Sequence, residues 1–105
     1  MNACQLSGVI DRKSVHITDN NEAVTFTLYT CDGINARHAY EDQIHVPCVI
    51  VSPSKQTIEG FRECKDEEFV ELCGRVQLWL PNTVKRREPV AYVIADESSV
   101  TFFKS

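Results

Sequence analysis

The feature that most constrains the fold is a long stretch of alternating side chains, EFVELCGRVQLWL, at residues 68–80. From Val70 to Leu80 every second residue is apolar or glycine, and the residues between them are mostly polar. A period of two is typical of a β-strand with one face toward a core, because successive side chains point to opposite faces. The stretch therefore predicts a long strand with Leu78 and Leu80 inside and Trp79 outside.

Three segments before this one also predict strands. The segment at 3–12 alternates as far as Gly8, where we expect a kink, and AVTFTLYTC at 23–31 alternates throughout. The turn-forming run TDNNE between them is expected to end the first strand or to join the two as a hairpin. The segment IHVPCVIVS at 44–52 is almost continuously apolar, which predicts a strand buried on both faces, with an edge or a bulge at Pro47.

The period changes in SPSKQTIEGFREC, between the third and fourth predicted strands. Ser52 can cap a helix and Pro53 suits the first helical position. Ile58 and Phe61 are three residues apart and share one helix face. The segment therefore predicts a short helix whose Ile58–Phe61 face packs against the strands.

The final segment, VAYVIADESSVTFF, predicts one or two more strands, broken around residues 96–99. The resulting order of three strands, a helix and further strands fits an all-β, five-stranded Greek-key β-barrel with a short helix between strands 3 and 4. Gly8 and Gly74 would lie within strands, where a small barrel coils sharply. No repeat or linker divides the chain, so we expect a single domain over residues 1–105.

Composition excludes several classes of protein. The net charge is −4, which argues against a dense basic surface but not against a local basic stripe. The five cysteines are widely spaced without a C-x-x-C pair, which favours buried, reduced thiols and no metal site. We expect neither an enzyme nor a cofactor, because no paired catalytic carboxylates and no phosphate-binding glycine loop are recognisable. Without a membrane span or a signal-peptide pattern, a cytoplasmic protein with no membrane partner is the expectation.

Four segments resemble, in their order, the bacterial single-stranded DNA-binding protein family: NACQLSGVIDR, NNEAVTFTLYT, IHVPCVIVS followed by the helix, and FVELCGRVQLWL. The motifs are degenerate, but their order covers nearly the whole chain. The resemblance implies an OB-fold that binds single-stranded DNA in replication, recombination or repair. It also implies a homodimer or homo-oligomer, with replication or repair proteins as further partners. The short length and the PCVIVS stretch are most similar to the tailless primosomal replication protein N branch.

The sequence departs from the family pattern in three places. Three residues separate Val70 from Gly74, where the family usually has one. Ile44 stands where the family often has an aromatic residue, so one stacking group is either missing or supplied by Tyr40 or His38 in the preceding loop. The chain also stops at VTFFKS without the acidic tip that recruits other enzymes in the longer members.

Binding single strands regardless of sequence needs aromatic faces for the bases and cations along the phosphate backbone. Trp79 is in line with Gln77 and Arg75 on the outward positions of its strand, directly before a basic loop at 81–89. The second strand and the loop after it add further aromatic and basic side chains. The predicted nucleic-acid-binding residues are Trp79, Arg75, Lys85, Arg86, Arg87, Tyr29, Arg37, Tyr40 and His45.

The same residues allow other interpretations. Trp79 also suits a contact under the hairpin or between subunits, and Arg75 suits an ion pair with Glu71 or a neighbouring strand. His45 also suits a histidine hydrogen-bonded within its sheet. The chain as a whole fits, as the alternative, an OB-fold protein-interaction module with weak or no DNA binding. The residues do not separate DNA from RNA as the ligand.

Overall fold

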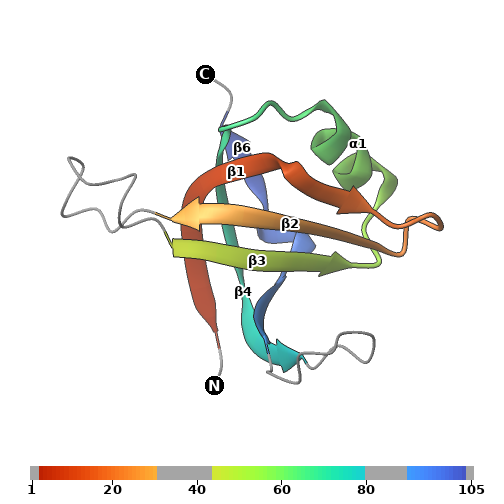
Figure 1. Cartoon of the computed structure of the whole chain (residues 1–105). Coiled ribbons are helices and arrows are strands. Elements are labelled where there is room, and N and C mark those ends of the chain that lie inside the picture. Colours follow the sequence, from red (N-terminus) through yellow and green to blue (C-terminus); the bar gives the residue numbers. More distant parts are fainter. Residues whose placement is uncertain (1–2, 31–43, 80–89, 104–105) are drawn as a thin grey trace.

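The computed structural model describes residues 3–30, 44–79 and 90–103. Figure 1 shows strands wrapped around a common interior, with the single α-helix of the described part at one end. The elements, in chain order, are β1 (Cys4–Ile17), β2 (Ala23–Thr30), β3 (Ile44–Val51), α1 (Lys55–Glu63), β4 (Phe69–Trp79), β5 (Val90–Ala95), the 3-10 helix η2 (Glu97–Ser99) and β6 (Thr101–Phe103).

The strands form one sheet in the order β1-β2-β3-β5-β4-β6, and β1 also pairs with β4, so the sheet closes on itself. All neighbours are antiparallel except β3 and β5, which run parallel. This order confirms the predicted all-β OB-fold with a short helix between the third and fourth strands. β6 is a short sixth strand beside the start of β4.

β1 closes the sheet because it pairs with two strands in succession. Its first part pairs with β4, and Val9 then pairs with both Phe69 of β4 and Tyr29 of β2. β1 runs to Ile17 and ends directly before the turn-forming run TDNNE, where the sequence predicted its end, and it then pairs with β2. Its register against β2 shifts between Asp11 and His16, and this bulge interrupts the alternation that sequence inspection relies on.

The interior is filled by the inward side chains of the closed sheet and by α1. Phe61 of α1 lies against Phe26 of β2 with their ring centroids 4.8 Å apart, and Ile58 is also buried. This confirms the predicted inward face of the helix. The buried apolar side chains are Ile10, Val24, Phe26, Leu28, Cys48, Ile50, Ile58, Phe61, Cys64, Val70, Leu72, Val93 and Ala95.

The described cysteines are free, as expected, but only two of them are buried. Burial raises the pKa of Cys48 to about 12, so this thiol stays protonated and behaves as a small apolar side chain. Burial also raises the pKa of Cys64. Cys73, by contrast, is exposed because it lies on the outward side of β4.

The predicted helix start is wrong by two residues. Ser54 is the N-cap, and its hydroxyl accepts a hydrogen bond of 3.2 Å from the Thr57 amide. Ser52 instead has a φ of 54°, in the left-handed region, because the chain turns sharply there between β3 and α1.

The prediction that β3 is buried on both faces is also wrong. Cys48 and Ile50 are buried, whereas Val49 is half-buried and Val51 is 60% exposed. A sheet closed on itself has an interior and an outside, and no helix of the described part of the chain packs over the outside of β3. At Pro47 the strand pairs with β2, and its pairing with β5 begins at Cys48, in keeping with the edge expected there.

The inward alternation of β4 holds at Val70 and Leu72, which are buried, but Val76 is 40% exposed. The pairing of β4 with β1 ends at Gly74. Beyond this point β4 pairs with β5 and extends past the closed part of the sheet. The side chain of Val76 therefore points to the inward side of β4 where the sheet no longer encloses it.

We expect Gly8→Ala and Gly74→Ala to destabilise the fold by about 1–3 kcal/mol each, or more. A Cβ atom at Gly8 would collide with the carbonyl oxygen of Tyr29, and one at Gly74 with that of Ile94. Neither oxygen can move without breaking the strand pairing. Urea unfolding followed by circular dichroism measures the effect.

Gly60→Ala is the matched control. Its Cβ would lie 3.6 Å from Phe102, an ordinary contact, within a helix where alanine is favoured over glycine by about 1 kcal/mol. Equal losses of stability in all three variants would contradict the proposed role of the two strand glycines.

Candidate nucleic-acid interface

The outside of the closed sheet carries an apolar and aromatic surface across four strands. The register joins Arg75 of β4 to Ile94 of β5, Ile94 to Val49 of β3, and Val49 to Thr25 of β2. A hollow of about 270 Å³ lies on this surface. We call this surface, made up of Thr25, Thr27, Tyr29, His45, Val49, Arg75, Gln77, Tyr92 and Ile94, the outer face.

The hollow lies in the middle of the outer face and brings together side chains from four strands. Gln77 of β4 pairs with Tyr92 of β5, and their neighbours around the hollow are Thr25, Val49 and Ile94. Three of these five residues are apolar or aromatic and none is charged. A shallow, open surface of this kind suits a flat apolar ligand better than it suits a catalytic reaction.

Tyr29 and His45 extend the outer face at the far ends of β2 and β3. They are cross-strand partners, and their ring centroids lie 4.4 Å apart in an edge-on arrangement with an interplanar angle of 74°. The Tyr29 hydroxyl donates a 2.8 Å hydrogen bond to Asp11 Oδ2. This bond and the charge of Asp11 raise the pKa of Tyr29 above its ordinary value. The Tyr29 ring is therefore held in a defined orientation, beside the exposed His45.

Arg75 is exposed on the outer face. Glu71, the partner considered from the sequence, lies four residues away along an extended strand, which is too far for an ion pair. Arg75 makes no hydrogen bond or ion pair with any residue in the described part of the chain. With respect to the described residues, its guanidinium group is therefore available for an external anion.

Several predicted site residues lie outside the described residues, and the predictions for them stay predictions. They are Arg37, Tyr40, Lys85, Arg86 and Arg87. For Trp79 the structure describes the backbone, which pairs with Val90 at the end of β4, two positions beyond Gln77. Ile44, Leu78 and Leu80 also have no described side chain.

Sequence inspection missed Tyr92, Val49, Ile94 and Thr25. Tyr92 and Ile94 alternate with the buried Val93 and Ala95, so the pattern of VAYVIA contained a signal for an outward aromatic residue. Val49 had no such signal, because its segment is apolar on both faces. Only the parallel pairing of β3 with β5 shows that Val49 and Ile94 meet on the outside.

The described residues contain no group of three or more side chains suited to hold a metal ion. Among the described helices, none is long and apolar enough to cross a membrane.

The strand order and the position of α1 define a fold class, the OB-fold. No protein-family model matches the chain, and no curated protein matches it in sequence. The comparison with solved structures is more informative, because it matches nearly the whole chain to single-stranded DNA-binding proteins.

Three of these structures illustrate the likeness. A Plasmodium falciparum SSB in complex with ssDNA superposes with a TM-score of 0.66 at 14% identity, covering 99% of this chain and 96% of the other. A small single-stranded DNA-binding protein from Mycoplasma pneumoniae gives 0.64 at 11% identity, covering 99% and 93%. The dimeric N-terminal domain of PriB from Thermoanaerobacter tencongensis gives 0.62 at 15% identity, covering 99% and 98%. The chain therefore has the fold of SSB and PriB proteins, which confirms at the level of the fold the resemblance found in the sequence.

The stability of the protein should fall at alkaline pH in a way that depends on Tyr29. Because the folded pKa of Tyr29 is raised, the stabilisation is fully present below the unfolded pKa near 10 and is lost as the pH rises through the higher folded value. Urea midpoints measured between about pH 8 and 11 should therefore decline more steeply in the wild type than in Tyr29→Phe. Parallel declines would contradict the Tyr29–Asp11 hydrogen bond.

Proposed function

We propose that this chain is a non-enzymatic single-stranded DNA-binding protein and that its outer face holds the DNA. The observation that carries the proposal is the hollow lined by Thr25, Val49, Gln77, Tyr92 and Ile94, on the uncovered side of the sheet. Solvent-facing strand positions are ordinarily polar. Apolar and aromatic side chains gathered there are therefore expected to be covered by a ligand, and base faces have the matching shape and chemistry.

The electrostatics support binding that depends on a few local cations. The chain has a net charge of −4, and Arg75 is the one cation of the outer face within the described residues. Asp11 lies beside Tyr29 and repels phosphate at that end. We propose that Trp79, Lys85, Arg86 and Arg87 extend the interface beyond Gln77, with Arg37 and Tyr40 contributing near the start of β3. Binding that uses so few cations should be of modest affinity and sensitive to salt.

The likeness to solved structures supports the same proposal. One of the similar structures is an SSB bound to ssDNA, and another is a dimeric PriB domain. We propose by analogy a role in DNA replication, recombination or repair, with assembly into a homodimer or homo-oligomer and contacts with replication or repair proteins. A cytoplasmic location would accord with such a role.

One alternative has specific support. An OB-fold protein-interaction module with weak or no DNA binding would account for the net acidic charge and for Asp11 beside Tyr29. RNA would use the same stacking surface, so it is a competing ligand in the experiment below.

The decisive measurement is fluorescence anisotropy of a labelled oligo-dT at low and at moderate salt. We expect salt-sensitive binding that Trp79→Ala and Tyr92→Ala each weaken about 5- to 150-fold, the effect of losing one stacked base. Phe103→Ala is the matched control, because Phe103 is an aromatic residue 46% exposed on β6, outside the outer face. Thermal unfolding of each variant separates lost binding from lost folding.

No binding by the wild type at about 50 µM protein in low salt would reject DNA binding, since even non-specific contacts register there. Equal losses in Tyr92→Ala and Phe103→Ala would reject the outer face as the site. A labelled oligo-U of equal length, bound more tightly than oligo-dT, would make RNA the ligand.

We expect Arg75→Ala to reduce the slope of log affinity against log salt by about one unit, because one phosphate contact is lost. Arg12→Ala is a control of the same charge, since the Arg12 side chain instead donates to the Arg62 carbonyl at the end of α1. Titrations of both variants over a range of salt concentrations measure the slopes. An unchanged slope for Arg75→Ala would place Arg75 outside the phosphate path.

A further inference from the structure

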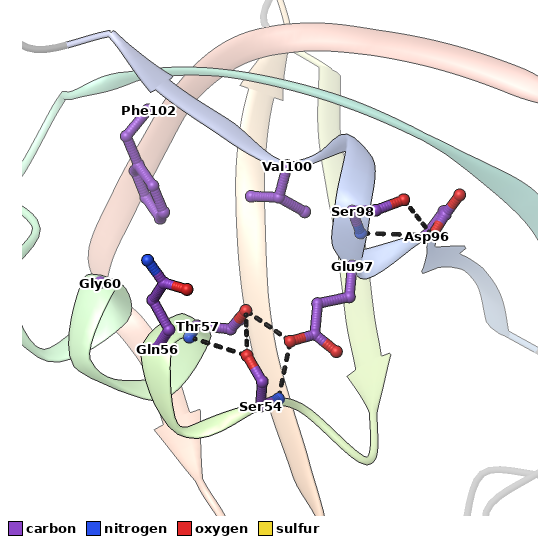
Figure 2. Close-up of a pocket in the computed structure, with 9 residues that line it drawn as sticks. All are labelled: Ser54, Gln56, Thr57, Gly60, Asp96, Glu97, Ser98, Val100 and Phe102. Carbon is purple, nitrogen blue, oxygen red and sulfur yellow. Dashed lines mark hydrogen bonds between the residues drawn. The ribbon is translucent and has the colours of Figure 1, made fainter.

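A second hollow, larger than the one on the outer face, lies between α1 and the segment that leads through η2 into β6. Its volume is about 680 Å³. Figure 2 shows Gln56 and Gly60 on the α1 side and Val100 and Phe102 on the side of β6, with Asp96 and Glu97 at the end near η2. We call this hollow, defined by those six residues, the α1–β6 groove.

The acidic end of the groove retains unused hydrogen-bonding capacity. Glu97 Oε1 accepts bonds of 2.6 Å from both the Ser54 amide and the Thr57 hydroxyl, which link η2 to the start of α1 (Figure 2). The Ser54 hydroxyl, the Thr57 hydroxyl and the Ser54 amide, in decreasing order of effect, lower the pKa of Glu97, so the carboxylate is ionised at neutral pH. Asp96 Oδ1 accepts from the Ser98 amide and hydroxyl, at 3.3 and 3.0 Å.

Each carboxylate thus uses only one of its two oxygens. Glu97 Oε2 and Asp96 Oδ2 have no hydrogen-bond donor in the described part of the chain. Among the described residues, no lysine or arginine lines the groove. Two anionic oxygens without a cation repel phosphate and attract an ammonium or guanidinium group.

The opposite side of the groove is apolar and is bordered by β6, a strand that is paired along one edge. Phe102 lies edge-on to Phe61, with ring centroids 5.1 Å apart, and the missing side chain of Gly60 leaves space beside it. β6 ends the sheet and pairs only with β4, through residues 69–71. Within residues 3–30, 44–79 and 90–103, no backbone hydrogen bond is made to the other edge of β6.

The outer side of β6 also carries exposed aromatic surface. Phe103 is 46% exposed and Phe69, its cross-strand partner, is 42% exposed. Their ring centroids lie 5.6 Å apart, so the two rings form one patch directly beside the free edge. A free edge, an apolar groove on one face and an aromatic patch on the other are the three parts of a strand-addition site.

We propose that the edge of β6 and the α1–β6 groove receive an extended segment of a partner protein that carries lysine or arginine alternating with apolar residues. The backbone of the segment pairs with β6, its basic side chains reach Asp96 and Glu97 in the groove, and its apolar side chains cover Phe103 and Phe69. This inference goes beyond the proposed DNA binding, and it does not depend on it. α1 and β6 lie at one end of the molecule in Figure 1, away from the end of β4 that bears Gln77.

The test uses two fluorescein-labelled peptides of about ten residues, long enough for strand addition, one alternating Lys with Val and the other alternating Glu with Val. Only the Lys–Val peptide should bind the full chain. Gln56 is exposed and lines the groove, so Gln56→Lys should weaken that binding about two- to fivefold and Gln56→Glu should strengthen it. Glu59→Gln adds the same charge as Gln56→Lys on α1, but outside the groove, and should have no effect.

Phe103→Ser removes the apolar patch at an exposed position and should weaken the Lys–Val peptide about tenfold while oligo-dT binding stays unchanged. Tyr92→Ala should do the reverse, so failure of the peptide site and failure of the DNA site are distinguishable. Equal binding of both peptides, or equal effects of Gln56→Lys and Glu59→Gln, would overturn the proposal.

Two further outcomes would also overturn it. If Gln56→Lys strengthens oligo-dT binding and the Lys–Val peptide does not bind, the groove serves nucleic acid. If Phe103→Ser converts a dimer to a monomer in analytical ultracentrifugation, the edge of β6 is occupied by a second copy of this chain.

Discussion

The structure depends on the double pairing of β1. Val9 pairs on one side with Tyr29 and on the other with Phe69, and this joins the two edges of the sheet. The strands can approach this closely only because Gly8 has no side chain to meet the Tyr29 carbonyl. Gly74 allows the same approach between β4 and β5. Closure removes the exposed edges of five strands and encloses one core.

Closure also decides what the outside of the sheet can do. α1 covers an end of the closed sheet through Ile58 and Phe61, so it leaves the sides uncovered. Apolar side chains such as Val49 and Ile94 therefore reach the surface, where they border the outer hollow with Tyr92. The same geometry leaves β6 as a short unclosed edge, next to the α1–β6 groove.

The two surfaces differ in charge, and this separates their expected ligands. Counting only partners in the described part of the chain, the outer face has an unpaired guanidinium group at Arg75, whereas the α1–β6 groove has carboxylate oxygens of Asp96 and Glu97 that accept no hydrogen bond. An acidic chain can hold an anionic ligand when its cations and its carboxylates lie on different surfaces. A basic protein segment and a nucleic acid would then occupy this molecule without competing for the same side chains.

The sequence by itself determined the element types, their order and most of the core. Two local patterns were sufficient for this: the alternation in residues 23–31 and 68–80, which follows from strand geometry, and the spacing of Ile58 and Phe61, which follows from helix geometry. It also identified Tyr29 and Arg75 as outward positions. Only the tertiary structure decided that Val49 faces outward with Ile94 and Tyr92 and that the register of β1 against β2 shifts at a bulge between Asp11 and His16. It also decided that β6, within the described part of the chain, keeps a free edge beside a groove. These features depend on which distant strands pair and in what register. A local pattern does not encode the pairing or the register, because a continuous apolar run fits either face of a strand.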